Sequence, residues 1–268
     1  MNHRMMSEME ECMRKRKSFK LKSNKVVNIF PISDLHFGSP QCNQEFFEYM
    51  LNKFDNTKGH KMIYLLGDLI DCATKRLGNS AYKQVYSVEE QLDYLIKQFK
   101  PYKNHIRGCV IGNHSARMKK EFDLDIIKIF CDALGIHYDG YEFYDTLCIN
   151  GEPYNVFGTH GTKTSQRINL IMGNIERQLS HIDANLYLYG HCHFGSNWSE
   201  LIKNNDGYSR KHYVLTGHFL NYDGSYAEEK LLKPSMPCFN KISIDKNLRT
   251  LVQQYNFDEI DKGYFDNE

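Results

Sequence analysis

The chain has 268 residues, which is enough for one large domain or two small ones with a substantial core. Its 34 Lys and Arg residues nearly balance its 33 Asp and Glu residues, so the net charge of +1 indicates neither a nucleic-acid nor a membrane partner. No apolar run approaches the roughly 18 residues of a membrane span, and the polar, basic start lacks a secretory signal pattern. The eight cysteines are scattered without Cys-x-x-Cys spacing, which favours a reducing, cytoplasmic location.

Positive charge is concentrated near the N-terminus, where seven basic residues lie from Arg14 to Lys25. A solvated arm is the simpler interpretation of this cluster, and an arm that lies along a polyanionic substrate is the alternative. No linker, internal repeat or low-complexity tract divides the rest of the chain. We therefore expect a basic arm at residues 1–24 and a single domain at residues 25–268.

Strand and helix patterns alternate in the first half of the chain. Short apolar runs predict buried strands at residues 26–33, 62–66 and 105–111. Apolar side chains at helical spacing predict covering helices at residues 46–54, 87–99 and 126–134. The second of these helices begins with a capping box from Ser87 to Glu90, and the third ends at Gly135.

β patterns dominate the second half. The predicted strands are residues 141–150, 154–157, 184–189, 198–203, 212–216, 239–244 and 250–255. One helix, with Ser165 as its cap, carries apolar side chains from Ile168 to Ile182. This order of elements predicts an α/β chain whose two sheets pack face to face between helical layers.

Polar side chains follow five of the strands where each strand ends. The clusters are Asp34-Leu35-His36, Gly67-Asp68-Leu69-Ile70-Asp71, Gly112-Asn113-His114, Thr159-His160-Gly161 and Gly190-His191-Cys192-His193. In the last cluster the two histidines can turn to the same side, while Cys192 points away and packs. Ligands of α/β sheets bind beyond the carboxyl ends of strands, where the loops converge. One such cluster would fit turn or capping chemistry, but five predict a single polynuclear metal site.

The residue types of these clusters indicate the kind of metal. Carboxylate, imidazole and amide ligands suit borderline divalent ions, and thiolate sites are absent from the pattern. Two ions about 3.5–4 Å apart, bridged by one carboxylate, can bind the non-bridging oxygens of a phosphoryl group and activate a water. We expect two divalent ions, with Mn²⁺ as the first choice and Fe, Zn or Ni as alternatives.

The ordered set Asp-x-His, Gly-Asp-x-x-Asp, Gly-Asn-His, His-Gly and Gly-His-x-His resembles the calcineurin-like metallophosphoesterase family. It extends from Asp34 to His193, about 160 residues, and contains all five blocks in order. The resemblance implies a four-layer α/β/β/α sandwich of two mixed sheets. It also implies seven metal ligands: Asp34, His36 and His193 on one ion, Asn113, His160 and His191 on the other, and Asp68 as the bridge.

The resemblance implies a different role for two further residues. His114 would protonate the leaving oxygen, and Asp71 would hold its imidazole in place, with plain helix capping by Asp71 as the alternative. Separately, the guanidinium of Arg117 suits bidentate phosphate recognition, with an exposed helix arginine as the alternative. His218 follows another strand and is interpreted as a structural histidine. The tyrosines are mostly core and rim, with Tyr82 and Tyr222 as open candidates for stacking on a base.

Departures from the family pattern narrow the branch. Cys72-Ala73 and Ile111-Gly112 replace the Arg-Gly pairs of protein Ser/Thr phosphatases, and Ser115 replaces an acidic residue, which counts against that activity. The opening Asp34-Leu35-His36-Phe37-Gly38 looks more like nucleases and phosphodiesterases, and residues 112–117 resemble small phage-type stand-alone members.

The expected function is therefore hydrolysis of a phosphodiester, either a nucleotide or a nucleic acid. A phosphomonoesterase or protein phosphatase is the alternative within the family. A nucleic-acid-binding module with a structural metal site is the alternative from another class. A structural site is normally closed by its ligands and has no use for an acid such as His114.

Overall fold

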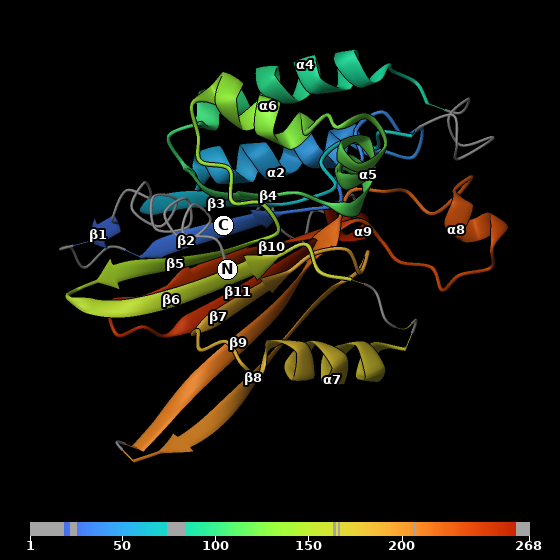
Figure 1. Ribbon diagram of the computed structural model, residues 1–268. Coiled ribbons are helices and arrows are strands. Elements are labelled where there is room, and N and C mark those ends of the chain that lie inside the picture. The colour runs from blue at the N-terminus through green and yellow to red at the C-terminus, as the bar shows by residue number, and fades with distance from the viewer. Residues whose placement is uncertain are drawn as a thin grey trace, which may run out of the picture.

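The computed structural model describes residues 19–21, 26–73, 84–162, 165, 167–205 and 207–260. Most of the expected basic arm lies outside these residues, and its described part forms a short strand, β1 (Phe19–Leu21). The described residues have a mixed α/β structure in which helices cover a folded, largely continuous sheet (Figure 1). No described helix has the length and apolar character needed to cross a membrane.

The remaining strands follow the predicted order along the chain. They are β2 (Val27–Ile32), β3 (His60–Leu66), β4 (Ile106–Val110), β5 (Glu142–Ile149), β6 (Glu152–Thr159), β7 (Leu186–Tyr189), β8 (Gly195–Asn204), β9 (Gly207–His218), β10 (Cys238–Ile244) and β11 (Thr250–Asn256). Hydrogen-bonded neighbours connect them in the order β1–β5–β6–β7–β9–β10–β2–β3–β4, with β8 beside β9 and β11 beside β10. Because β9 pairs with β10, the two separate sheets of the expected four-layer sandwich are not confirmed.

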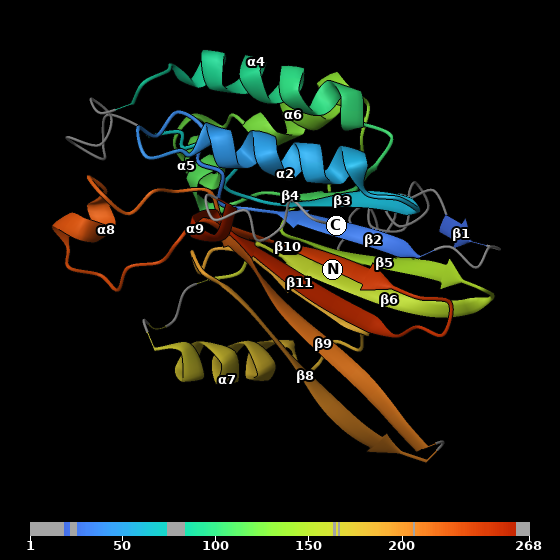
Figure 2. The same ribbon diagram turned by 180° about the vertical axis from the view of Figure 1, so that it is seen from behind.

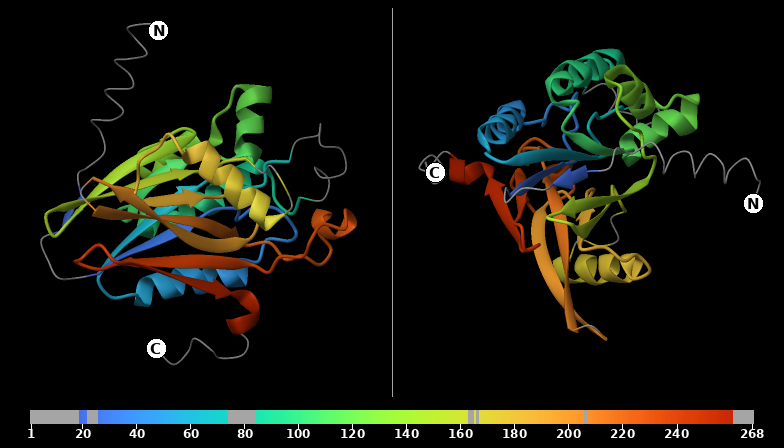
Figure 3. Two further views of the ribbon diagram at one scale, coloured as in Figure 1. Left: turned by 90° about the horizontal axis from the view of Figure 1, so that it is seen from below. Right: turned by 90° about the vertical axis from the view of Figure 1, so that its left-hand side faces the viewer.

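Helices lie on both outer sides of the strands. They are α2 (Gln44–Asn56), α4 (Val88–Phe99), the 3₁₀ turn η2 (Lys100–Tyr102), α5 (Asn113–Phe122), α6 (Ile126–Leu134), α7 (Ile168–Leu179), α8 (Tyr226–Glu229) and α9 (Phe257–Ile260). Helices α2, α4 and α6 cover the side of β2, β3 and β4, and α7 lies on the opposite side of the molecule (Figures 2 and 3).

Alternating side chains divide the apolar residues into three clusters. On β3, Met62, Tyr64 and Leu66 face the cluster between the two halves of the sheet, whereas Ile63 and Leu65 face the helices α2, α4 and α6. A third cluster lies between α7 and the strands β6, β7 and β9. Strands such as β3 and β7 are therefore buried on both faces, which is why they read as continuous apolar runs in the sequence.

Helix ends follow local signals, with one exception. The capping box of Ser87 and Glu90 is present, and Gly135 ends α6 with a φ of 68°. Helix α7 begins after Arg167 instead of Ser165, because the Ser165 hydroxyl accepts a hydrogen bond from the Arg167 amide in a turn before the helix. The sequence pattern did not mark the bounds of helix α5, which begins directly at Asn113 and carries Arg117, for which a helical position was one alternative.

Two sets of parallel strands deliver their carboxyl ends to the same region. Strands β2, β3 and β4 run parallel to one another, and so do β6, β7 and β9. The ends of both sets lie toward α5 and α8 (Figure 1). This arrangement brings the five polar clusters of the sequence to one edge of the molecule.

Candidate metal centre and its pocket

The five polar clusters lie side by side at one edge of the molecule. They bring together all seven predicted ligands, His114 and Asp71. Three clusters follow β2, β3 and β4, and the other two follow β6 and β7. Close approach of two of these ends depends on glycine, since a Cβ on Gly112 would collide with the carboxylate of Asp68. Arg117 lines the pocket that opens beside the clusters.

Left-handed backbone is concentrated among the predicted ligands. Five of them have φ angles of 48° to 65°: Asp34, His36, Asp68, His191 and His193. This conformation costs a residue other than glycine on the order of 1–3 kcal/mol, and it persists where the surroundings enforce it, commonly at functional sites. Here it directs side chains at alternate positions of the loops into one space.

Asp34, His36 and His193 form the first cluster. Asp34 Oδ2 accepts hydrogen bonds from the Ser33 hydroxyl at 2.6 Å and from the His191 amide at 2.8 Å. Asp34 Oδ1 is buried without a hydrogen-bond partner among the described residues. It lies 3.1 Å from His193 Nε2 and 3.7 Å from His36 Nε2. A buried carboxylate oxygen that faces two imidazole nitrogens fits a cation.

The second cluster surrounds His160. Its Nδ1 donates to the carbonyl of Leu66 at 2.8 Å, so in the neutral ring Nε2 keeps its lone pair. This Nε2 lies 3.2 Å from Asp68 Oδ2 and 2.9 Å from Asn113 Oδ1. The distance from His160 Nε2 to His191 Nδ1 is 3.1 Å. Four atoms with lone pairs therefore converge, which is favourable only with a proton or a cation between them.

The amide of Asn113 can face the cluster in two orientations. With Oδ1 turned to the cluster, the oxygen joins the other potential ligand atoms. With the amide turned over, its nitrogen donates to Asp68 Oδ2 at 2.9 Å and to His191 Nδ1 at 2.8 Å, while Oδ1 accepts from Arg117 at 3.3 Å. Hydrogen bonding favours the second orientation in the absence of a cation, and coordination would favour the first.

Asp68 belongs to both clusters. Its Oδ1 accepts a hydrogen bond from the His114 amide at 2.8 Å. Its Oδ2 lies 3.2 Å from His160 Nε2 and 3.9 Å from His36 Nε2. One oxygen is thus held by the backbone, and the other lies between the two groups of imidazoles.

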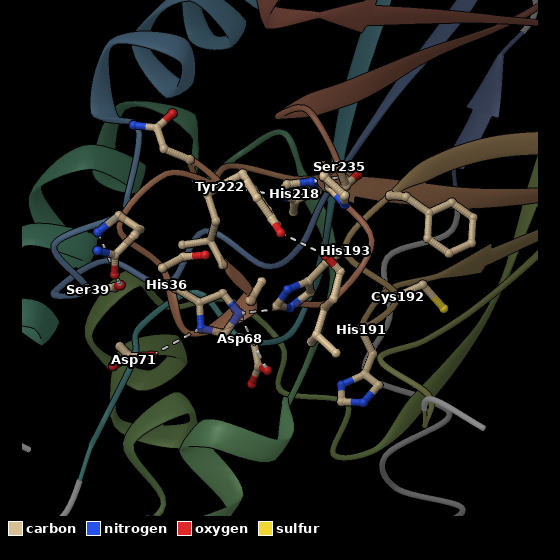
Figure 4. Close-up of a pocket in the computed structure, with 18 of the residues that line it drawn as sticks. His36, Ser39, Asp68, Asp71, His191, Cys192, His193, His218, Tyr222 and Ser235 are labelled. Atoms are coloured by element: carbon tan, nitrogen blue, oxygen red, sulfur yellow. Dashed lines mark hydrogen bonds and ion pairs between the residues drawn. The ribbon is translucent and has the colours of Figure 1, made fainter. Parts of the chain in front are cut away.

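Asp71 contacts both a predicted ligand and the predicted acid. His114 Nδ1 lies 2.8 Å from the Asp71 carbonyl oxygen and 3.1 Å from Asp71 Oδ1. The same Oδ1 lies 3.3 Å from His36 Nδ1 (Figure 4). Because a carbonyl only accepts, His114 carries a proton on Nδ1, and its Nε2 lies toward Asp68 Oδ2 at 3.9 Å.

Behind Asp71 lies a polar network that the sequence did not reveal. Gln91 is fully buried on α4, and its Oε1 accepts from the amides of Asp71 and Cys72, both at 3.2 Å. Its Nε2 donates to the carbonyl of Tyr86 at 2.9 Å and to Gln84 Oε1 at 3.1 Å. Gln84 in turn donates to Asp71 Oδ2 at 2.8 Å. The available signal was a glutamine within the buried stripe of a helix.

Mutual charge governs the protonation of the centre. Burial alone would lower the pKa of His36, but the nearby carboxylates of Asp34 and Asp71 raise it to about 10. Burial also lowers the pKa of His160, but the negative charge of Asp68 outweighs this effect and raises the pKa to about 9. Protons therefore occupy these imidazoles when no cation is bound, and a cation would replace them.

Two neighbouring residues have structural roles, as the sequence predicted. The Leu220 amide donates to His218 Nδ1 at 3.2 Å, so His218 Nε2 carries a proton and donates to the Ser235 hydroxyl at 3.1 Å. Both nitrogens of this ring are therefore in use. The ring also stacks on His193, with centroids 5.7 Å apart. The Cys192 side chain points away from the centre into the cluster beneath α7 (Figure 4).

No protein-family model and no curated protein sequence matches the chain. Among solved structures, a metallophosphoesterase from Sphaerobacter thermophilus has a TM-score of 0.44 and 14% identity over 86% of this chain and 87% of that chain. Vacuolar Protein Sorting 29 from Cryptosporidium parvum has a TM-score of 0.43 and 13% identity over 87% and 98%. A predicted phosphoesterase from Streptococcus pneumoniae has a TM-score of 0.39 and 12% identity over 87% and 99%. At identities and TM-scores this low, only the side chains of this chain indicate the chemistry of the site.

Proposed function

We propose that this protein hydrolyses phosphoesters with the help of two divalent metal ions that share Asp68. One observation carries the proposal: a single oxygen of Asp68 faces two imidazole clusters, while the His114 amide holds the other oxygen. When bound, the two ions would hold phosphoryl oxygens and supply an activated water.

The ligand atoms divide between the two ions by their distances. One ion would be held by Asp34, His36 and His193, the other by Asn113, His160 and His191, and Asp68 would contact both. Two features of the chain support this assignment: the partnerless oxygen of Asp34 and the converging lone pairs around His160. The mixture of carboxylate, imidazole and amide fits Mn²⁺, Fe²⁺ or Zn²⁺.

His114 would complete the reaction as a proton donor. Hydrolysis adds water across the bond between phosphorus and the leaving oxygen, and that oxygen must gain a proton. His114 Nδ1 is held by Asp71, so Nε2 is the atom that would give the proton and later regain one from solvent. The carboxylate of Asp71 would stabilise the charged ring before the transfer.

A phosphodiester, such as a nucleotide or nucleic acid, is the favoured substrate class in this proposal. Arg117 lines the same pocket and would bind a phosphate oxygen. The neutral residues Cys72 and Ser115 near the centre support a substrate other than a phosphoprotein. A phosphomonoesterase is the alternative. A phosphodiesterase and a phosphomonoesterase can be told apart by comparing hydrolysis of a diester and a monoester.

The test compares bis(p-nitrophenyl) phosphate with p-nitrophenyl phosphate after removal of metals and addition of Mn²⁺. We expect hydrolysis of the diester that depends on Mn²⁺ and is abolished by a chelator. Faster hydrolysis of the monoester would support the alternative. If the protein binds metal but hydrolyses neither compound, the proposal fails and a structural metal site becomes the better explanation.

A further inference from the structure

The connection between β9 and β10, residues 219–237, is unusually long. Connections in compact domains most often have about 4–6 residues, and those longer than about 12–15 residues are usually functional. This segment, which we call the 219–237 segment, contains α8 and extends beside the carboxyl ends of the strands (Figure 1). Its length and its position next to the proposed metal centre indicate a function at that centre.

The first part of the 219–237 segment is tied to the loop that follows His36. The amide of Asn221 donates to the carbonyl of Gln41 at 2.9 Å. The side chain of Gln41 donates to the carbonyl of Gly224, and that of Asn43 donates to Asn221 Oδ1, both at 2.9 Å. The segment therefore begins from a fixed base at the centre.

The second part is held in a bend. The Tyr222 hydroxyl donates to the carbonyl of Leu232 at 2.8 Å, and the Leu232 amide donates to the carbonyl of Ala227 at 2.8 Å. Ser235 accepts the hydrogen bond from His218, whose ring stacks on His193 (Figure 4). These contacts hold the segment as a wall that faces the predicted ligands.

A pocket of about 940 Å³ lies between this wall and the proposed metal centre. Leu220, Tyr222, Leu232 and Met236 line it from the segment, and Ile171 lines it from α7. The volume is at the upper end of the about 300–1,000 Å³ typical of small-molecule sites. These side chains offer apolar and aromatic surface to an organic group attached to the phosphate, and the same segment adds the polar or charged side chains of Asn221, Glu229 and Lys233 to the lining.

We propose that the pocket holds the nucleoside of a compact phosphodiester substrate, with its base against Tyr222 and Leu232 and its phosphate at the proposed metal centre. This inference rests on the proposed function and narrows its substrate class. A base in a duplex could reach the wall only after unpairing, which costs a few kcal/mol. The pocket therefore favours a nucleotide over duplex nucleic acid. Tyr82, the other candidate for stacking on a base, lies outside the described residues.

The first test measures binding, not turnover. Isothermal titration of the Mn²⁺-loaded protein would compare inorganic phosphate with each of the four nucleoside 5′-monophosphates. We expect at least one nucleotide to bind about tenfold or more tightly than phosphate, because the pocket adds contacts with the base. Equal affinities for phosphate and all four nucleotides would overturn the proposal.

Adjacent leucines provide a matched pair of variants. Leu232 lines the pocket, whereas Leu231 is 90% exposed and does not. Leu232→Ala should weaken nucleotide binding about tenfold and leave phosphate binding unchanged. Leu231→Ala should change neither affinity. An equal loss of both ligands in Leu232→Ala, or the same loss in Leu231→Ala, would overturn the assignment of the wall.

Tyr222→Phe keeps the ring but removes the hydrogen bond to Leu232. It should weaken nucleotide binding less than Leu232→Ala, with phosphate binding and the melting temperature near those of the unmodified protein. If Leu232→Ala fails to fold, the comparison of phosphate with the four nucleotides in the unmodified protein still decides the proposal. Unchanged nucleotide affinity in Tyr222→Phe would show that the bend does not position the wall.

Cleavage separates this inference from the function on which it rests. With Mn²⁺, we expect a dinucleotide to be hydrolysed faster than duplex DNA at the same concentration of phosphodiester bonds. Faster cleavage of the duplex would overturn the inference and leave the metal-dependent hydrolase intact. Absence of any hydrolysis, including that of the chromogenic diester, would instead contradict the proposed function.

Discussion

At the residue scale, the two buried carboxylates of the centre are arranged alike. Asp34 and Asp68 each use one oxygen for hydrogen bonds from the protein and turn the other toward imidazoles. A carboxylate that only caps a turn would satisfy its oxygens with amides. The oxygen left for the centre therefore marks each as a candidate ligand.

Asp68→Asn tests the bridging role. An amide carries no charge and cannot balance two cations, so the variant should lose activity and at least one metal per chain. Elemental analysis after gel filtration measures the metal content. The exposed Asp132→Asn is the control and should retain both. Two metals per chain with normal turnover in Asp68→Asn would exclude the bridge.

His114→Asn separates an acid from a ligand. The variant should keep its metal content, while kcat falls by about 10²–10⁴-fold, as for loss of a general acid. The loss should shrink for p-nitrophenyl esters, whose leaving group needs no proton. Equal losses on poor and activated leaving groups, or loss of metal, would contradict the assigned role.

At the element scale, helix α4 supports the centre from behind through Gln91. Gln91→Met keeps the length of the side chain but leaves the amides of Asp71 and Cys72 without their acceptor. We expect destabilisation by about 1–3 kcal/mol and a lower kcat, most for poor leaving groups, because Asp71 positions His114. Metal content should not change.

Gln98→Met, on the same helix but partly exposed, is the control for this substitution. Denaturant unfolding measures the stability, and hydrolysis of one ester with a poor leaving group and one p-nitrophenyl ester measures the dependence on the leaving group. If Gln91→Met only lowers stability and affects all leaving groups equally, the glutamine is structural.

Helix α6 shows how a cap makes stability depend on pH. Asp125 accepts hydrogen bonds from Lys119, Tyr138 and the Lys128 amide, and these hold its pKa below the usual value although burial opposes them. A depressed carboxyl pKa stabilises the fold above the unfolded value of about 3.9, and this contribution is lost as the pH falls through the folded pKa.

Asp125→Asn should therefore lower the free energy of unfolding at neutral pH by up to about 1 kcal/mol, since Asn caps as well but lacks the charge. The difference from the unmodified protein should shrink as the pH falls below the usual carboxyl pKa. Urea unfolding over that pH range measures it. A difference independent of pH would show that charge is not the cause.

At the scale of the whole molecule, the candidate ligands come from both halves of the sheet. Asp34, His36, Asp68 and Asn113 follow strands of one half, and the three other histidines follow β6 and β7. Metal binding would tie these halves together at their carboxyl ends. Away from the candidate centre, an ion pair between the partly buried Arg107 on β4 and the buried Asp145 on β5 also joins the halves.

Metal should therefore raise the melting temperature. At 100 times its Kd, a ligand stabilises the folded state by about 2.7 kcal/mol, or about 5–10 °C for a chain of this size. Differential scanning with Mn²⁺ and with a chelator measures the shift, which should shrink in Asp68→Asn. An unchanged melting temperature at saturating metal would mean that metal does not bind the folded centre.

Much of the candidate centre could be located from sequence because its signals are local. A strand that ends in Gly67-Asp68 or Gly190-His191 shows its apolar run and its polar terminus within a few residues. The same locality made the Ser87 cap and the Gly135 stop of α6 predictable. Whether these residues bind metal stays a prediction.

Features that depend on distant contacts were decided only by the tertiary structure. The sequence alone determined the strands apart from β1, their polar ends and the residue types suited to divalent ions. Folding decided which oxygen of Asp68 lies free, that Gln91 supports Asp71, and that the 219–237 segment forms a pocket wall. It also joined β9 to β10, so that the expected separate sheets form one hydrogen-bonded network. The reason is physical: side-chain identity and periodicity are written locally, whereas hydrogen-bond partners and cavities arise where segments far apart in the chain pack together.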